Sequence, residues 1–371
     1  MKLSIERAAL LRSLNHVQSV VERRNTIPVL SNVLLSANDG VLSMTTTDMD
    51  LEINESVAAN VEKDGATTAP AHTLHDIVRK LPDDSEVELE LNAEGTQMTV
   101  KAGRSQFKLS CLPTSDFPQI GAGDLPTELA IPANDLRALI DRTKFAMSTE
   151  ETRYYLNGIY LHAAENEGVA VLRAVATDGH RLARFEMPLP EGAAEMPSVI
   201  IPRKAIGEIR KLIDEAADAI KITLSESKIR FAFDHVVLTS KLIDGTFPDY
   251  QRVIPEGNDK VVEIDAKSLT SAVDRVSTIS DGKSRAVKIA LNGKLLTLSA
   301  SSAESGSATE EMEVSGETEI EIGFNAKYLL DITSQIEGEG CRFTLADPAS
   351  PTIIQDNSDP SALYVLMPLR V

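Results

Sequence analysis

The chain opens with residues 3–17, Leu-Ser-Ile-Glu-Arg-Ala-Ala-Leu-Leu-Arg-Ser-Leu-Asn-His-Val, in which alternating apolar residues pass directly into a helical spacing. The same order of a short strand and an amphipathic helix returns at residues 129–141 and at residues 262–276. The three starts lie 126 and 133 residues apart, which is too long for a solenoid repeat and fits a domain. The repeat therefore predicts three similar domains.

Each third of the chain continues in the same way. A second strand and helix follow at residues 67–81, 199–214 and 320–336, and alternating strands come after them. Gly-rich polar segments near residues 121–124 and 255–258 mark the breaks, and small residues at 299–308 predict a loop within the last third. We expect an α+β fold of three similar domains, each with two helices packed on antiparallel sheets, at residues 1–125, 126–256 and 257–371.

Composition narrows the class of protein. Of the 371 residues, 42% are apolar and none is Trp, so the cores are expected to be aliphatic. No uncharged apolar run approaches the ~20 residues that cross a bilayer, and the first residues predict a strand rather than a signal peptide. Two cysteines, Cys111 and Cys341, are too few for a disulfide framework or a zinc site. We expect a cytoplasmic protein without membrane contact.

The charges are unevenly distributed. The chain has 37 basic and 56 acidic side chains, a net charge of −19, which argues against indiscriminate coating by nucleic acid. The six predicted helices nevertheless hold 16 basic and 8 acidic residues, a net of +8, and the remainder has a net charge of −27. These helices are the segments 7–24, 72–80, 134–144, 203–214, 267–275 and 325–336.

Two explanations fit this distribution. Loops generally favour Asp and Glu, so the basic helices could simply be solvated faces. Alternatively, the helices line a positive surface inside a body whose exterior repels phosphate, and such a surface attracts the DNA backbone without recognising its sequence.

No catalytic or metal-binding pattern is complete. Phosphate-binding loops, the nucleophile elbow G-x-S-x-G and the metalloprotease pattern H-E-x-x-H are absent from the sequence, and His72 and His75 have no further ligand nearby. Asp178 and His180 could form a base and the group that orients it, although the intervening glycine favours a turn. We predict neither a catalytic site nor a cofactor, nor a bound metal.

The most specific motifs lie in the last two thirds of the chain and resemble the bacterial sliding clamp, the beta subunit of DNA polymerase III. The resemblance covers the whole chain. These motifs are Arg-Tyr-Tyr-Leu-Asn-Gly at 153–158, Ala-Thr-Asp-Gly-His-Arg-Leu at 176–182, Phe-Pro-Asp-Tyr at 247–250 and Tyr-Val-Leu-Met-Pro-Leu-Arg-Val at 364–371.

The resemblance implies a head-to-tail homodimer that closes into a ring of six domains, with helices around the hole and sheets outside. Such a ring encircles duplex DNA, slides without sequence specificity and confers processivity on the replicative polymerase. By the resemblance, the dimer seam joins Phe107 and Leu109 to Thr278 and Ile279 of the other chain. The implied DNA-facing residues are Arg24, His72, Glu150, Tyr154, Tyr155, Arg203 and Lys204.

The resemblance also implies a peptide-binding groove that is shared by the polymerase III alpha subunit, the clamp loader complex, and other polymerases and repair proteins. The apolar chain end, residues 365–371, is expected to dock there, because an undocked apolar end would fray. The implied groove residues are Leu156, Thr177, Gly179, His180, Arg181, Leu182, Pro248, Val253, Val365, Met367, Pro368 and Leu369.

Two other functions compete with the sliding clamp at this stage. A protein-interaction scaffold that does not encircle DNA would show no salt-dependent retention on DNA. An enzyme that uses Asp178 and His180 would have a concave pocket and would lose turnover when the histidine is replaced.

Overall fold

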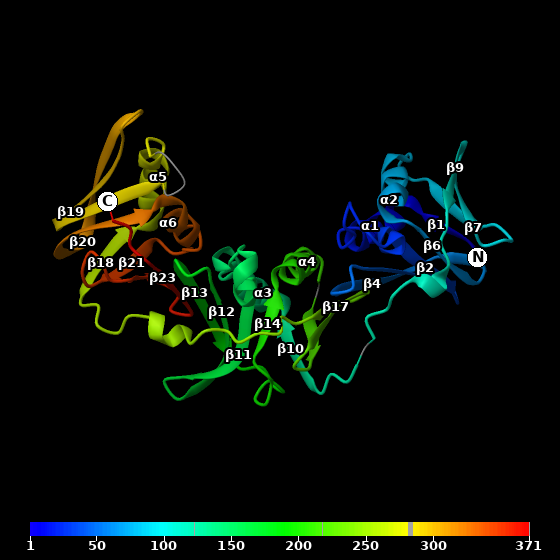
Figure 1. Cartoon of the computed structure of the whole chain (residues 1–371), viewed down its shortest axis with the longest axis horizontal. Coiled ribbons are helices and arrows are strands. Elements are labelled where there is room, and N and C mark those ends of the chain that lie inside the picture. Colours follow the sequence, from blue (N-terminus) through cyan, green and yellow to red (C-terminus); the bar gives the residue numbers. More distant parts are fainter. Residues whose placement is uncertain (122, 217, 281–284, 371) are drawn as a thin grey trace. The chain divides into compact units, whose positions relative to one another are not determined.

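The computed structural model describes residues 1–121, 123–216, 218–280 and 285–370 (Figure 1). Ala122, within the first expected break, and Val371, at the apolar chain end, lie outside the described residues. The chain folds as two compact units. Unit 1 comprises Met1–Leu136, Pro190–Pro197 and Lys204–Leu242, and unit 2 comprises Arg137–Leu189, Ser198–Arg203 and Ile243–Val371.

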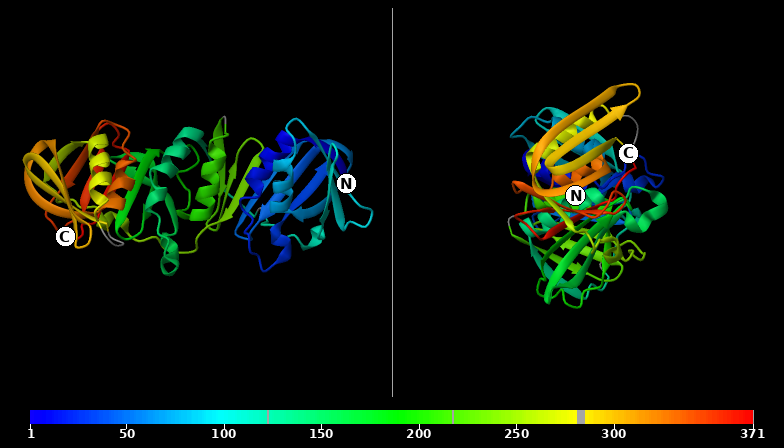
Figure 2. Two further views of the ribbon diagram at one scale, coloured as in Figure 1. Left: turned by 90° about the horizontal axis from the view of Figure 1, so that it is seen from above. Right: turned by 90° about the vertical axis from the view of Figure 1, so that its left-hand side faces the viewer.

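Six α-helices occur among the described residues, two in each third of the chain. Helix α4 buries Ile206, Ile209 and Ile213, which recur one turn apart on one face. At the start of α5 the Asp265 carboxylate accepts the Ser268 N–H at 2.7 Å, a side-chain cap. In unit 2, α5 and α6 lie side by side (yellow and orange in Figure 2). The helices are α1 (Arg7–Val17), α2 (Ala71–Lys80), α3 (Ala133–Asp141), α4 (Arg203–Ile213), α5 (Ala266–Ser277) and α6 (Ala326–Thr333), with 3₁₀ turns η1 (Pro28–Ser31), η2 (Thr114–Asp116), η3 (Lys144–Ala146), η4 (Glu151–Leu156) and η5 (Tyr250–Val253).

Unit 1 contains two antiparallel sheets. The five-stranded sheet has the order β5-β1-β7-β8-β9, and the eight-stranded sheet has the order β10-β15-β16-β17-β4-β3-β2-β6. Pairing of β17 with β4, from Val236↔Glu55 to Ser240↔Leu51, joins segments from the first and second thirds of the chain. The strands are β1 (Lys2–Glu6), β2 (Asn32–Asn38), β3 (Val41–Thr47), β4 (Leu51–Ala58), β5 (Asn60–Lys63), β6 (Gly65–Pro70), β7 (Glu86–Leu91), β8 (Gln97–Ala102), β9 (Ser105–Ser110), β10 (Thr127–Pro132), β15 (Ala219–Leu224), β16 (Lys228–Ala232) and β17 (Val236–Lys241).

Unit 2 is built on one ten-stranded antiparallel sheet of order β14-β11-β12-β13-β23-β22-β21-β18-β20-β19. Its second and last thirds meet where β13 pairs with β23, from Arg181↔Leu366 to Phe185↔Ala362. The strands are β11 (Gly158–Asn166), β12 (Val169–Thr177), β13 (Arg181–Pro188), β14 (Val199–Pro202), β18 (Lys260–Asp265), β19 (Ala286–Ser302), β20 (Gly306–Asn325), β21 (Gly340–Leu345), β22 (Thr352–Asp356) and β23 (Ala362–Leu366).

Helix α1 is shorter than the sequence predicts. It ends at Val17 rather than Arg24, because the Thr46 hydroxyl donates to the Val17 carbonyl at 2.6 Å and the Ser19 hydroxyl donates to the His16 carbonyl at 2.7 Å. These bonds satisfy carbonyls at the helix end. The helices as observed carry 12 basic and 6 acidic residues, a net of +6 rather than +8. The remainder is still strongly acidic.

The predicted loop at residues 299–308 is mostly strand. Strands β19 and β20 stay paired as far as Ser302↔Gly306, so the turn comprises only residues 303–305. Leu298 and Ala300 are buried on the inner face of the hairpin. Pairing and burial here override the loop-like composition of the small residues.

His16 connects α1 to two other segments of unit 1. The His16 Nδ1 lies 2.7 Å from Glu55 Oε2, and its Nε2 lies 2.8 Å from Glu215 Oε1. The buried Glu55 also accepts the Ser13 hydroxyl at 2.7 Å, and Arg12 Nε lies 2.8 Å from Glu215 Oε2. The hydrogen bond to Glu55, supported by that to Glu215, raises the pKa of His16 in spite of its burial. When the His16 ring is protonated on both nitrogens, it can donate to both the Glu55 and the Glu215 carboxylates.

Replacing His16 by asparagine is expected to lower the urea midpoint of unfolding far more at about pH 6 than at about pH 9. Because the folded pKa is raised, this stabilisation is complete below the ordinary histidine pKa of about 6.5 and disappears as the pH rises through the folded value. We expect a loss on the order of 2 kcal/mol at the lower pH. The exposed His235→Asn variant is the control. Equal losses of stability in His16→Asn at both pH values would show that His16 is uncharged in its contacts with Glu55 and Glu215.

Candidate functional site

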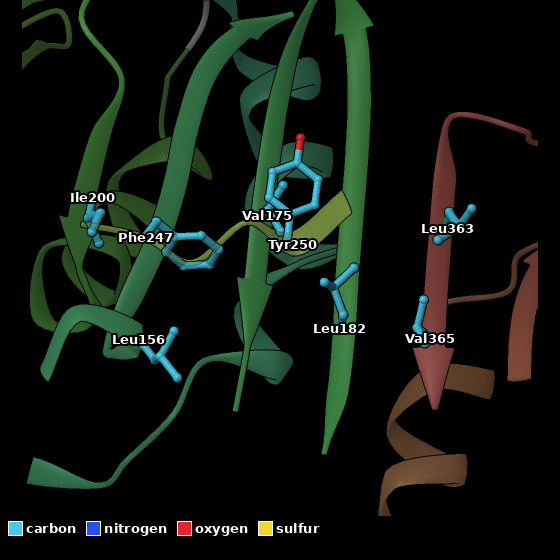
Figure 3. Packing of buried hydrophobic residues seen from close by; sticks show 8 residues of the cluster. All are labelled: Leu156, Val175, Leu182, Ile200, Phe247, Tyr250, Leu363 and Val365. Carbon is cyan, nitrogen blue, oxygen red and sulfur yellow. The ribbon is translucent and has the colours of Figure 1, made fainter. Parts of the chain in front are cut away.

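An apolar cluster in unit 2 is the best-defined candidate site. Its members come from η4, the segment around η5, and strands β12, β13, β14 and β23, so residues far apart in sequence meet on one sheet (Figure 3). Tyr155, Tyr160, Ile243, Ile254 and Ile353 pack against it and are partly buried. We call this set the apolar cluster: Leu156, Val175, Leu182, Ile200, Phe247, Tyr250, Leu363 and Val365.

Three predicted groove residues, Leu156, Leu182 and Val365, belong to the apolar cluster. Pairing of Leu182 with Val365 brings β13 and β23 together, and the Met367 N–H donates to the His180 carbonyl at 3.0 Å. The other predicted groove residues are half-buried (Thr177, Met367, Pro368, Leu369), exposed (Gly179, His180, Pro248, Val253) or, for Arg181, buried.

The turn before β13 is organised by side chains. Asp178 Oδ1 accepts the N–H groups of His180 and Arg181 at 2.9 and 3.0 Å, and the Thr177 hydroxyl donates to the Arg181 carbonyl at 2.7 Å. Gly179 has a φ of +87°, which glycine adopts without strain. Asp178 therefore shapes this turn, and the exposed His180 ring stacks on Tyr328 at 6.2 Å.

Arg181 is held inside the protein. Its guanidinium lies 3.1 Å from Asp178 Oδ2 and 2.5 Å from Asp331 Oδ2, and donates to the Phe145 carbonyl at 2.6 Å. It also lies over the Tyr328 ring, 4.3 Å from the ring centroid. Arg181 therefore links η3, β13 and α6 beside the apolar cluster.

Five members of the apolar cluster are not among the predicted groove residues: Val175, Ile200, Phe247, Tyr250 and Leu363. Phe247 and Tyr250 belong to the quoted motif at 247–250, so this motif was the available signal. The three aliphatic residues lie in strands β12, β14 and β23, and apolar residues of buried strands give no sign of which neighbouring segment covers them.

The predicted DNA-facing residues of unit 1 have different surroundings. Arg24 is exposed in the loop after α1, and His72 Nε2 lies 2.9 Å from the Val21 carbonyl, which joins α2 to that loop. Lys204 is paired with Asp48 at 2.6 Å and with Glu22. Burial alone would lower the pKa of Lys204, but its hydrogen bonds to these carboxylates outweigh burial and raise it.

Four predicted DNA-facing residues lie in unit 2. Tyr154 is 53% exposed, whereas Tyr155 packs against the apolar cluster, so the two adjacent rings have different roles. Glu150 is exposed and lies 3.2 Å from Arg153 Nε. Arg203 donates to the carbonyls of Met147 and Ser148, and burial lowers its pKa.

The predicted seam residues lie at sheet and helix ends. Phe107 is 37% exposed on β9, which is an edge strand of its sheet, whereas the Leu109 side chain is buried. In unit 2, Thr278 is the exposed C-cap of α5, and Ile279 is half-buried next to it.

Among the described residues, no three His, Cys, Asp or Glu side chains gather where they could hold a metal ion. His75 Nε2 instead lies 2.7 Å from Asn15 Oδ1. None of the helices that the structure describes has both the length and the apolarity needed to cross a bilayer.

The repeated α+β units and the apolar cluster define a three-domain protein of the DNA clamp type. Models of the DNA polymerase III beta subunit match the chain in order: the N-terminal domain at residues 1–121, the central domain at 130–249 and the C-terminal domain at 251–370. The predicted domain limits at 125 and 256 stay predictions.

Relatives match over their full length. Beta sliding clamps of Caulobacter vibrioides and Escherichia coli are 54% and 39% identical, over 372 and 373 residues, and cover 100% of both chains in each case. The chain belongs to the DNA polymerase III beta subunit family. The predicted resemblance, the α+β clamp fold and the function of a DNA sliding clamp are thereby confirmed.

Solved clamps have the same fold. A Caulobacter crescentus beta sliding clamp, with polyethylene glycol at its proposed beta-motif tethering region, superposes with a TM-score of 0.98 at 54% identity and covers 100% of this chain and 99% of the other. A Bartonella birtlesii clamp bound to griselimycin superposes with a TM-score of 0.97 at 50% identity and covers 100% of both chains.

Replacing Gly179 by alanine is expected to destabilise unit 2 by about 1–2 kcal/mol, because an L-residue strains the positive φ of this turn. The matched control is Gly207→Ala in α4, where a Cβ meets nothing within 4 Å and alanine should stabilise the helix by about 1 kcal/mol. Urea unfolding measures both changes. Equal effects of the two substitutions would contradict the assigned turn geometry.

Proposed function

We propose that two copies of this chain close head to tail into a ring around duplex DNA. The single observation that carries this proposal is the charge distribution, since the helices have a net charge of +6 in a chain of net charge −19. In the ring, the helices face the DNA and the acidic remainder faces away. Phosphate contacts of this kind carry no sequence information, so the ring slides.

The seam continues the sheets from one chain to the next. Strand β9 is an open edge in unit 1, and β19 is an open edge in unit 2. The exposed Phe107 side chain adds apolar contact at this edge, while Leu109 supports the strand from the core. An unpaired edge is an aggregation risk, and closure of the ring removes it.

Seven residues face the DNA in this proposal, and they act differently. Arg24 and Tyr154, both exposed, contact the backbone directly. The cations of Arg203 and Lys204 are engaged within the protein, so they contribute mainly by positioning their surroundings. The remaining three are His72, Glu150 and Tyr155.

The apolar cluster and its exposed neighbours form the tethering groove. An apolar surface on an acidic protein suits a short peptide with one or two apolar anchors. We assign to it the polymerase III alpha subunit, the clamp loader, and other polymerases and repair proteins as competing partners. Griselimycin, which binds the Bartonella clamp, is assigned to the same surface.

The chain acts as a processivity subunit in the bacterial cytoplasm. Its contribution is a topological link that raises the local concentration of the polymerase at the primer end. It needs no catalytic site for this task, and Asp178, one of the two residues of the candidate catalytic pair, accepts backbone hydrogen bonds in the turn before β13.

Retention on DNA after loading tests the ring. Protein loaded by the cognate clamp loader should stay on nicked circular DNA and run off the same DNA after linearisation, because only free ends release a closed ring. Gel filtration of the DNA-bound fraction measures this. Equal loss from both DNAs would contradict encirclement, and absence of salt-dependent retention on either would favour a scaffold that does not encircle DNA.

Replacing Val253 by glutamate tests the groove. Val253 is 44% exposed, so the fold should tolerate the change. Loss of this apolar side chain from the groove should weaken partner binding by about 1–2 kcal/mol, or about tenfold. Primer-extension length with the polymerase III alpha subunit should fall, and retention on circular DNA should not. The control is Val169→Glu, which is also exposed in unit 2 but is not among the predicted groove residues. Unchanged extension with Val253→Glu would contradict the groove assignment.

A further inference from the structure

The hydroxyl of Tyr250 points away from the apolar cluster to which its ring belongs. Figure 3 shows the ring beside Val175 with the oxygen directed away from Leu156 and Leu182. The hydroxyl lies 3.0 Å from His162 Nε2 on β11 and 2.9 Å from Arg173 Nη1 on β12. The ring is therefore part of the buried apolar cluster, and the oxygen is part of a polar network on the other side of the ring.

The guanidinium in this network is buried and paired. Arg173 is 4% exposed, and its Nε lies 2.5 Å from Oε1 of Glu186 on β13, which is 7% exposed. Glu186 Oε2 accepts the Asn166 side-chain N–H at 2.8 Å, and Arg184 Nε lies 3.4 Å from its Oε1. A buried ion pair of this kind is costly to break, so it fixes the position of the Arg173 donors.

The hydrogen-bond partners define the protons. The Nδ1–H of His162 donates to the Ala163 carbonyl at 2.9 Å, so Nε2 of a neutral ring is an acceptor. Tyr250 then donates its hydroxyl proton to Nε2, and its oxygen accepts from Arg173. Burial, with Arg173 nearby, lowers the pKa of His162 and favours this neutral form.

A stack of aromatic rings holds Phe247, three residues before Tyr250, against the same sheet. Tyr160 on β11 stacks on Phe247, with centroids 4.7 Å apart and planes at 5°, and its centroid lies 4.6 Å from the His162 ring. Phe247 and Tyr250 are thus both held against β11 and β12. The exposed Pro248 lies between Phe247 and Tyr250, and the exposed Val253 follows Tyr250 three residues later.

We propose that Arg173, Glu186 and His162 are positioning residues of the tethering groove, which act through the Tyr250 hydroxyl. They hold the segment from Phe247 to Val253 on the sheet, so that Pro248 and Val253 stand at the rim of the apolar cluster before a partner arrives. This inference rests on the proposed groove. Preorganisation of this kind raises affinity because the segment need not be ordered on binding.

Loss of a single oxygen tests the inference. In Tyr250→Phe the ring remains, but Arg173 Nη1 and His162 Nε2 lose their partner in a buried site, and the segment is expected to loosen. Griselimycin affinity, measured by calorimetry on the full chain, should fall by about tenfold. The matched control is Tyr364→Phe, also buried in unit 2 but outside the apolar cluster, and it should bind as the wild type does.

Three arms distinguish the outcomes. If Val253→Glu does not weaken griselimycin binding, the proposed groove is wrong. If Val253→Glu weakens it while Tyr250→Phe lowers only the melting temperature, the groove stands and the positioning role is refuted. If both weaken it and Tyr364→Phe does not, the positioning role is supported.

A spectroscopic readout separates positioning from general stability. Nitrogen-15 NMR of the wild type should show a neutral, Nδ1-protonated His162, and the Nε2 shift should change in Tyr250→Phe. Griselimycin affinity of the wild type should fall as the pH drops through the lowered pKa of His162, because a protonated Nε2 no longer accepts the hydroxyl. Tyr250→Phe should not show this dependence. Among the described residues, the charged or titratable groups that face this ring are Arg173, Glu186, Tyr160 and Tyr250. An identical pH profile in both proteins would overturn the inference.

Discussion

Backbone pairing between strands at the sheet edges determines how the parts of this chain are joined. A strand with an unpaired edge leaves N–H and C=O groups that seek a partner. Here β17 pairs with β4 and β13 pairs with β23, so segments from different thirds of the chain share one sheet. In the proposed ring, a second copy continues the same pattern at the open edges β9 and β19. In the proposed ring, strands of the two chains pair in the same way, and this pairing closes the ring.

The same pairing creates the apolar cluster to which we assign the tethering groove. Because β13 and β23 lie side by side, Leu182 and Val365 join one apolar cluster, and the segment around η5 completes it. Polar groups beneath the surface then keep it in shape: Asp178 and Arg181 fix the turn before β13, while the Arg173 network holds Tyr250. In the proposed groove, binding therefore depends on buried charge as well as on exposed apolar residues.

Periodicity in the sequence predicted the repeated strand–helix blocks and all six helices, since long amphipathic patterns are strong local signals. It placed the end of α1 at Arg24 instead of Val17, because the hydroxyl of Thr46 that closes this helix comes from a distant strand. It also missed the β19–β20 hairpin, whose small residues are ordered by pairing. The members of the apolar cluster that belong to sequence motifs could be identified from the sequence. Val175, Ile200 and Leu363 could not, because the order of strands in the sheet decides which segment covers them.

The proposed ring requires that the basic helices face the DNA and the acidic remainder faces away, so the arrangement of the helices in the assembled protein decides whether it forms. Single-particle electron microscopy of the full chain should show a closed annulus of two copies, with the six helices of each copy around the central opening and the sheets outside. An open assembly, or a closed one with helices on its outer surface, would rule out the proposed ring.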